Sequence, residues 1–297
     1  MIRKLTLALA APLLLVATSC ASEADNGAVE VRTGAAATQA LQAAPDAVTE
    51  AGTASMEMVM EMAIEGRAIE MRATGAMDAE AQQMTMELDM GAMFRGLAEQ
   101  TGESLPEGLD EPMRVVADGT TMYVQMPFLS ALGAPSGWLS MDLEELGMGA
   151  DTLGAYDLRG TLETLRGATG EPEVVGTEEV RGVETTHYRV TVDLAQALEE
   201  APESARAALE QMGGAAGLEG AEMVVDIWID ADGLPRRQSM DMGSMFGAMG
   251  MGAASATMTI EYFDFGEPVD IEVPAPEEVT PFTDVMGAFG GLGSAVS

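Results

Sequence analysis

Cysteine and histidine, which often serve in nucleophilic and metal chemistry, each occur once in this chain, as Cys20 and His187. A single cysteine excludes a disulfide within the chain, and a single histidine excludes a zinc site built from several histidines. A catalytic histidine would need a serine and an orienting carboxylate, and no spacing around His187 nominates them. The 49 acidic residues are too numerous for one pair to stand out as an acid–base couple. We therefore expect a structural histidine, no catalytic residues, no enzyme activity and no cofactor.

Asp230 and Asp232 superficially resemble the start of a calcium-binding loop. The further ligands that such a loop needs are missing downstream, and Asp232-Gly233 is a good turn signal between two strands. We therefore interpret this segment as a hairpin and expect no metal site there.

Cys20 ends an N-terminal segment that has the layout of an export signal. Two basic residues precede an apolar run over 5–17, which is too short to span a bilayer as a permanent helix. Residues 16–20, Val-Ala-Thr-Ser-Cys, resemble a bacterial lipobox, although Ala17 stands where leucine is commonest. In such signals the cysteine becomes the first mature residue and carries acyl chains, two or more of which anchor a protein stably. We predict a signal peptide over 1–19 and lipidation of Cys20; an ordinary signal peptide with a chance cysteine is the alternative.

The net charge is −35, and loss of residues 1–19 would remove Arg3 and Lys4 and make it −37. Such a chain is a poor partner for DNA or RNA, because phosphate binding needs clustered basic residues. The negative charge also repels anionic lipid headgroups. We therefore expect the folded part of the chain to be held at the extracytoplasmic face of the cell membrane by its lipid anchor and not by electrostatic attraction. Hydrophobic residues make up 47% of the chain, which is enough for a sizeable core.

Alternation of apolar and polar residues with a period of two predicts strands along most of the chain. Turn signals join several of them at Gly66-Arg67, Asp118-Gly119, Arg181-Gly182 and Asp232-Gly233. The predicted strands cover 56–64, 68–77, 83–90, 113–117, 121–126, 138–141, 172–180, 183–193, 221–230, 234–241 and 256–265.

Helical spacing of apolar residues predicts a helix over 35–51, broken or kinked near Pro45. Further helices are predicted over 142–148, 157–168 and 194–212, the last with Asp193 as its N-cap.

Strands and helices are segregated along the chain, which favours an α+β fold with a curved antiparallel sheet, a half-barrel that holds helices on its concave face. We expect a flexible tether over 20–34, one domain over 35–282 with an extended, proline-rich stretch over 267–281, and a loose tail over 283–297.

Four short stretches carry a resemblance to a known family: Gly176–Val180, Val183–Val190, Val225–Arg236 and Tyr262–Pro274. Together with the lipobox and the order of elements, they resemble the actinobacterial LppX/LprA/LprF/LprG group of lipoproteins, which are LolA-like in fold. The resemblance implies an apolar cavity for acyl chains and movement of glycolipids or lipoglycans between envelope layers. The chain departs from the group in its acidity, its excess of methionine and an insertion near 240–255.

Methionine is unusually abundant, with 25 residues. The plain interpretation is that methionines fill irregular positions in the core, because the side chain is flexible. The alternative is a face that adapts to several acyl chains, since flexible thioether surfaces suit promiscuous apolar ligands. The candidates for such a lipid cavity are Met56, Met58, Met60, Met62, Met84, Met86 and Met122.

The methionine- and glycine-rich segment 240–252 allows three interpretations. It could be a flexible connection between two strands, a lid over a pocket, or a soft-metal site, because thioethers select Cu(I). The Met-x-Met pairs at 240/242 and 249/251 favour copper, and the lack of supporting histidine or cysteine opposes it. The lid candidates are Met242, Met245, Phe246 and Met249.

These observations favour a non-catalytic envelope lipoprotein that binds the acyl chains of lipids or glycolipids and carries them between envelope layers. We expect a monomer, with an envelope transporter as a further candidate partner. One alternative is a sensor or scaffold that binds another envelope protein, and another is Cu(I) binding by methionines.

Overall fold

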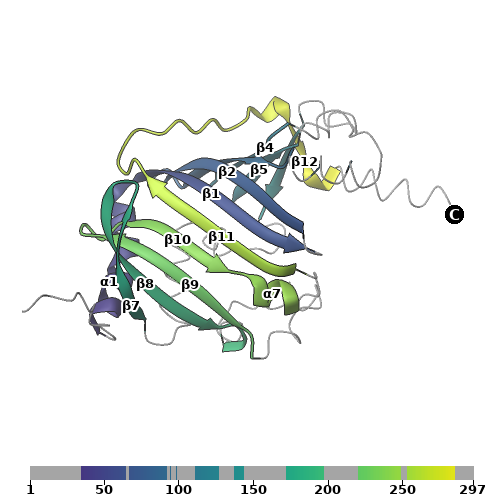
Figure 1. Cartoon of the computed structure of the whole chain (residues 1–297). Coiled ribbons are helices and arrows are strands. Elements are labelled where there is room, and N and C mark those ends of the chain that lie inside the picture. Colours follow the sequence, from purple (N-terminus) through teal and green to yellow (C-terminus); the bar gives the residue numbers. More distant parts are fainter. Residues whose placement is uncertain are drawn as a thin grey trace, which may run out of the picture. The chain divides into compact units, whose positions relative to one another are not determined.

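The computed structural model describes residues 35–64, 67–91, 111–126, 137–143, 172–196, 220–248 and 253–284, together with Phe94 and Ala98. Its strands form one 12-stranded sheet in the order β12-β6-β5-β4-β3-β2-β1-β11-β10-β9-β8-β7 (Figure 1). The strands are β1 (Thr53–Ile64), β2 (Arg67–Asp78), β3 (Gln83–Asp89), β4 (Met113–Asp118), β5 (Thr121–Gln125), β6 (Trp138–Asp142), β7 (Glu173–Val180), β8 (Val183–Asp193), β9 (Glu222–Asp230), β10 (Pro235–Asp241), β11 (Ala253–Phe263) and β12 (Val279–Pro281). The described helices include α1 (Ala35–Ala51), α7 (Gly243–Ala248) and the 3₁₀ turn η3 (Pro276–Glu278).

The predicted antiparallel sheet is confirmed, with one exception at its edge. The neighbouring strands from β6 to β7 all pair antiparallel, whereas β12 pairs parallel with β6. The parallel pairing is possible because a long stretch of chain after β11 returns to the far edge of the sheet before β12 begins, as a parallel neighbour requires.

The predicted hairpin turns are confirmed at three places. Arg181 and Gly182 have φ of 49° and 83°, and Gly119 and Gly233 also have positive φ, as tight turns between twisted strands require. The first predicted turn was wrong by one residue, because Arg67 already pairs with Ile64 as part of β2. Residues 65 and 66, which connect β1 to β2, lie outside the described residues.

The segment that resembles a calcium loop is a hairpin, as predicted. Asp230 Oδ1 accepts hydrogen bonds from the backbone N–H groups of Asp232 and Leu234 at 3.0 and 2.9 Å. Its Oδ2 accepts a bond from Arg236 Nε at 2.6 Å. The carboxylate is thus fully engaged in shaping the turn between β9 and β10.

Helix α1 has the bounds predicted from the sequence, but it continues through Pro45 without a break. Its buried residues, Ala37, Leu41, Ala44, Pro45 and Val48, repeat at helical spacing along one face. Packing of that face explains the continuity, because tertiary contacts stabilise a helix that proline alone would weaken.

Asp193 is an N-cap, as predicted, because its Oδ1 accepts bonds from Ala195 N at 2.9 Å and Gln196 N at 3.1 Å. The helix predicted over 194–212 is described only as far as Gln196. The helix predicted over 157–168 lies outside the described residues, as does most of the one over 142–148; Asp142 belongs to β6 instead.

One core cluster joins α1 to the sheet. It contains Leu41 and Val48 of α1 together with residues of β1, β2, β8, β9 and β11, and Val190, Val225 and Ile227 are 0% exposed within it. Figure 1 shows α1 behind the end of the sheet that β7, β8 and β9 form. Strands β2 and β8 are five inter-strand spacings apart, about 24 Å in a flat sheet. A single helix spans about 10 Å, so the sheet has to bend for these strands to share one core around α1.

After β11 the chain forms a strap over 264–278 that runs across the sheet to β12 (Figure 1). Thr53, which begins β1, holds its start: Thr53 Oγ1 donates to Glu267 O at 2.7 Å, and Gly266 N donates to Thr53 O at 3.0 Å. The extended conformation predicted for 267–281 is confirmed up to Ala275. After Ala275 the chain forms η3 and then β12. Residues 285–297 lie outside the described residues.

No helix in the described ranges has both the length and the apolar composition that crossing a bilayer requires.

Candidate functional site

The strand register sorts the methionines onto one face of the sheet. Directly opposite residues of an antiparallel pair point to the same face, so the face of one residue can be followed from strand to strand. All fourteen methionines within the described strands fall on the same face, which we call the methionine face. They are Met56, Met58, Met60, Met62, Met71, Met77, Met84, Met86, Met113, Met122, Met141, Met223, Met240 and Met258.

The seven methionines predicted to line a lipid cavity all lie on this face, on β1, β3 and β5. Met56 is 6% exposed and belongs to the core with α1, and Met84 and Met86 pack against that core. The other candidates are half-buried: Met58, Met60, Met62 and Met122. The structure thus brings the candidates onto one surface, which is closed near α1 and also buried at Val124 of β5 and Leu139 of β6.

Several of the methionines lie directly opposite very small residues. Met56 faces Gly75 across β1 and β2, Met58 faces Ala73, and Met84 faces Ala117 across β3 and β4. In the first pair the thioether itself fills the space above the glycine, because Met56 Cγ lies 3.3 Å from where a Cβ atom of Gly75 would stand. The methionine face therefore combines flexible side chains with small neighbours on the adjacent strands.

The segment predicted as a flexible connection or lid contains helix α7, which begins directly after β10. Asp241 Oδ1 accepts a bond from Gly243 N at 2.9 Å, and Phe246 N donates to Met242 O at 3.0 Å. Met242 N donates to Ala256 O at 2.8 Å, which extends the β10–β11 ladder into this connection. Up to residue 248 the segment is thus a short helix at the ends of β10 and β11 (Figure 1).

The side chains of the lid candidates Met242, Met245 and Phe246 are half-buried there. Met249 lies outside the described residues.

The opposite face is polar and carries a network of ion pairs. Arg181 Nε lies 2.7 Å from Glu261 Oε2, and its guanidinium also bonds to Glu57. Arg237 bonds to Glu261 at 2.9 Å and to Glu178 at 2.6 Å. Glu178 and Arg181 belong to the β7–β8 hairpin, so this network fastens the hairpin onto β10, β11 and β1.

Glu261 lies between two guanidinium groups, and its acidity changes accordingly. Burial disfavours the carboxylate, but the hydrogen bonds and charges of Arg237 and Arg181 outweigh that effect and lower the pKa of Glu261. Burial also opposes the charge of Arg181, and its bonds to Glu57 and Glu261 outweigh this, so that the pKa of Arg181 is raised.

His187 lies in β8 on this polar face and is held on two sides. Its Nε2 lies 2.6 Å from Asp226 Oδ1, and its ring stacks on Trp228 with centroids 4.1 Å apart. Asp226 also accepts two bonds from Arg189, which raise the pKa of that arginine. These contacts hold the ring of His187 in place, although the sequence did not indicate which residues would be its partners.

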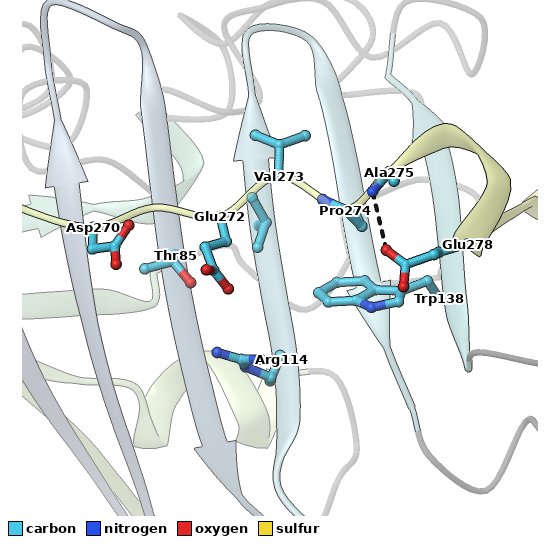
Figure 2. Close-up of a pocket in the computed structure, with 10 residues that line it drawn as sticks. Thr85, Arg114, Trp138, Asp270, Glu272, Val273, Pro274, Ala275 and Glu278 are labelled. Carbon is cyan, nitrogen blue, oxygen red and sulfur yellow. Dashed lines mark hydrogen bonds between the residues drawn. The ribbon is translucent and has the colours of Figure 1, made fainter.

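A cavity of about 680 Å³ lies on the polar face, beneath the strap (Figure 2). Its floor is formed by Thr85 of β3, Arg114 and Val116 of β4 and Trp138 of β6. The strap supplies the remaining walls, and in Figure 2 Glu272 points toward the sheet whereas Val273 points away from it. The lining residues from the strap are Asp270, Glu272, Val273, Pro274, Ala275 and Glu278.

This cavity could not be predicted from the sequence, because it depends on a strap that crosses strands more than a hundred residues away in the chain. Its charged lining is a poor environment for a hydrocarbon chain. In the described part of the chain, no group of three or more histidine, cysteine, aspartate or glutamate residues is placed to hold a metal ion.

Comparison with known proteins gives one sequence relative and several similar folds. No family model matches the chain. An uncharacterised 31.2 kDa protein from the rplA–rplJ intergenic region of Streptomyces griseus is 32% identical over 133 residues. The match covers 44% of this chain and spans only 41% of the relative's length.

Among solved structures, the chain is similar to two mycobacterial proteins of the group that its sequence resembles. The lipoprotein LppX from Mycobacterium tuberculosis is 14% identical, with 80% of this chain and 98% of that chain covered and a TM-score of 0.46. LprF from Mycobacterium bovis is 15% identical, with 82% and 99% covered and a TM-score of 0.45. A LolA-superfamily protein from Nitrosomonas europaea is 8% identical, with 79% and 94% covered and a TM-score of 0.29.

Proposed function

We propose that this protein is a non-catalytic envelope lipoprotein, anchored through Cys20, that binds the acyl chains of a lipid or glycolipid against its methionine face and carries them between envelope layers. The observation that carries the proposal is the segregation of the sheet. Every described strand methionine lies on one face, and the charged residues that form ion pairs lie on the other.

The chemistry of the methionine face suits hydrocarbon. Unbranched thioether side chains beside glycine and alanine can adapt to acyl chains of different length. A wholly structural core would need this flexibility less, because fixed cores are specified better by branched side chains. The core cluster around α1 contains such residues, including Val190, Val225 and Ile227, together with Met56 and Met77.

Energetics are consistent with exchange rather than with permanent storage. Burial of a 16-carbon chain contributes roughly 13 kcal/mol at ~0.8 kcal/mol per methylene. Removal of the same chain from a bilayer costs about as much, so transfer between membrane and protein is close to balanced.

Two tryptophan substitutions on neighbouring residues test the proposal. Met60→Trp adds volume to the methionine face, whereas Val59→Trp adds similar volume to the polar face of the same strand. The whole chain is exported with Cys20→Ala, so that no covalent acyl group is counted, and is purified without detergent. Lipid that accompanies each protein is then measured by native mass spectrometry and after solvent extraction.

The unsubstituted protein and Val59→Trp are expected to carry acyl lipid at similar occupancy. Met60→Trp is expected to weaken binding about tenfold, because overpacking of an apolar site costs on the order of 1–3 kcal/mol. Circular dichroism melting confirms that both variants are folded. The proposal fails if the unsubstituted protein carries no lipid and takes up none from vesicles, or if the two variants lose lipid equally.

A further inference from the structure

Gln238 of β10 is a polar residue on the methionine face. It lies opposite Ile227 of β9 and Ile260 of β11, and its relative exposure is 1%. Its Nε2 makes one weak contact, with the Sδ atom of Met240 at 3.5 Å. Its Oε1 is buried without a hydrogen-bond partner.

An unsatisfied acceptor in such a place needs an explanation, because buried polar side-chain atoms are nearly always hydrogen-bonded. Rotation of the amide by 180° does not remove the problem. The N–H₂ group would then occupy the orphan position, and the oxygen would face a sulfur that cannot donate a proton. In either orientation one polar atom of the buried Gln238 amide has no hydrogen-bond partner.

The surroundings indicate where that group could come from. Met240 lies next to Gln238 on the same face, directly opposite Met258, which in turn lies opposite Met60. The Sδ atom of Met240 is the weak acceptor that contacts Gln238 Nε2. Met240 is a flexible side chain at the end of a row of half-buried methionines. A chain that displaced the thioether of Met240 would reach the amide of Gln238.

We propose that Gln238 selects lipids whose hydrocarbon part carries a hydrogen-bond donor, a hydroxyl or an amide N–H, which its Oε1 accepts. This inference rests on the proposed function, since it assigns a polar anchor within the same lipid-binding face. In a low-dielectric site a hydrogen bond is stronger than in water, and a buried acceptor left without one is costly. The anchor thus discriminates between two chains of equal length that differ only in the donor.

Binding of matched probes tests the assignment. The probes are methyl stearate and methyl hydroxystearates with the hydroxyl at different chain positions, offered to the delipidated full-length chain with Cys20→Ala. We expect at least one hydroxylated ester to bind about tenfold more tightly than methyl stearate. The variant Gln238→Met, which keeps the size of the side chain, is expected to lose that preference.

A neighbouring residue provides the control. Ser239→Ala removes a hydroxyl from the polar face, where it lies 3.2 Å from Thr259 Oγ1, and should leave the preference unchanged. The melting temperature gives a second readout in delipidated protein. Gln238→Met should raise it, since an unsatisfied amide is removed, whereas Thr185→Val should lower it, because Thr185 is buried with its hydroxyl bonded to Glu178 O at 2.6 Å.

The outcomes separate the two proposals. If all esters bind equally, or if Gln238→Met keeps the preference for a hydroxylated ester, the role of Gln238 is refuted and lipid binding stands. If no ester binds to any form of the protein, lipid binding itself is refuted, and the role of Gln238 falls with it.

Discussion

Met60 and Met258 lie directly opposite each other on β1 and β11, at the centre of the sheet. They belong to a row of four methionines that crosses β10, β11, β1 and β2, with Met240 on one side and Met71 on the other. Such a row presents a continuous strip of flexible, polarisable side chains. The strip runs across the strands, the direction in which one extended ligand would touch several strands at once.

Oxidation of the methionines should report on a ligand at this strip. Met60 and Met258 are half-buried. In delipidated protein, dilute peroxide should therefore oxidise both side chains. Loading with an acyl lipid should slow their oxidation several-fold, as measured by peptide mass spectrometry. Met56 and Met77, each 6% exposed in the core beside α1, should oxidise slowly in both forms. Equal rates at Met60 with and without lipid would contradict contact between lipid and the strip.

Substitution of Cys20 should release the protein from the membrane. The variant Cys20→Ala lacks the thiol that would be acylated, so the protein should move from the membrane fraction to the soluble fraction. Ser19→Ala changes the preceding residue and keeps the thiol, so this control should remain in the membrane fraction. Metabolic labelling with a palmitate analogue provides the direct measurement, and label that persists in Cys20→Ala would refute the assignment.

Gly75 has a steric requirement that predicts a large effect of a single methyl group. A Cβ atom at this position of β2 would lie 2.3 Å from Thr85 O of β3 and 3.3 Å from Met56 Cγ. Because backbone cannot yield cheaply, Gly75→Ala should destabilise the fold by about 1–3 kcal/mol in urea unfolding. At Gly176 of β7 a Cβ atom would meet nothing within 4 Å, so Gly176→Ala should change stability by less than about 0.5 kcal/mol.

Acid should weaken the fold through Glu261. Burial opposes its ionisation, but the bonds from Arg237 and Arg181 prevail and lower the pKa of Glu261 in the folded protein. The carboxylate of Glu261 therefore binds a proton more readily in the unfolded chain than in the folded protein. Its stabilisation of the folded protein is fully present above the ordinary glutamate pKa and is lost as the pH falls through the lowered pKa of the folded state.

The variant Glu261→Gln should accordingly lose about 1–2 kcal/mol at pH 7, an amount reduced by the partial exposure of Arg181. The difference from the unsubstituted protein should shrink as the pH falls below about 4. Glu87→Gln is the matched control, since Glu87 is 51% exposed and lies 3.7 Å from Arg114. If the difference in unfolding free energy between Glu261→Gln and the unsubstituted protein stayed constant between pH 7 and pH 3, the ionised carboxylate of Glu261 would not be the cause of that difference.

Most of the strands could be located from the sequence, because the alternation of side chains along a strand is a local property. Met56, Met58 and Met60 alternate with Glu57 and Val59, and this pattern alone separates two faces. Turn residues such as Arg181-Gly182 and the cap at Asp193 were equally predictable, since each depends on backbone geometry within a few residues.

The sequence alone could not indicate the position of Gln238. Strand β10 reads Pro-Arg-Arg-Gln-Ser-Met-Asp, which is polar along most of its length and shows no clear alternation. Only the pairing of β10 with Ile227 on one side and Ile260 on the other places the amide on the buried face. Register between distant strands depends on the packing of the whole sheet, and local composition does not determine it.

By itself, therefore, the sequence determined most of the strands and the existence of a methionine-rich face, because each follows from short-range patterns of residue type; the export signal and the anchor at Cys20 stay predictions. The tertiary structure alone decided the ion pairs of Arg181 with Glu57 and Glu261, the cavity beneath the strap and the unsatisfied oxygen of Gln238. The physical reason is distance along the chain. Arg181 and Glu57 are 124 residues apart, and only the long-range pairing of strands brings such residues into contact.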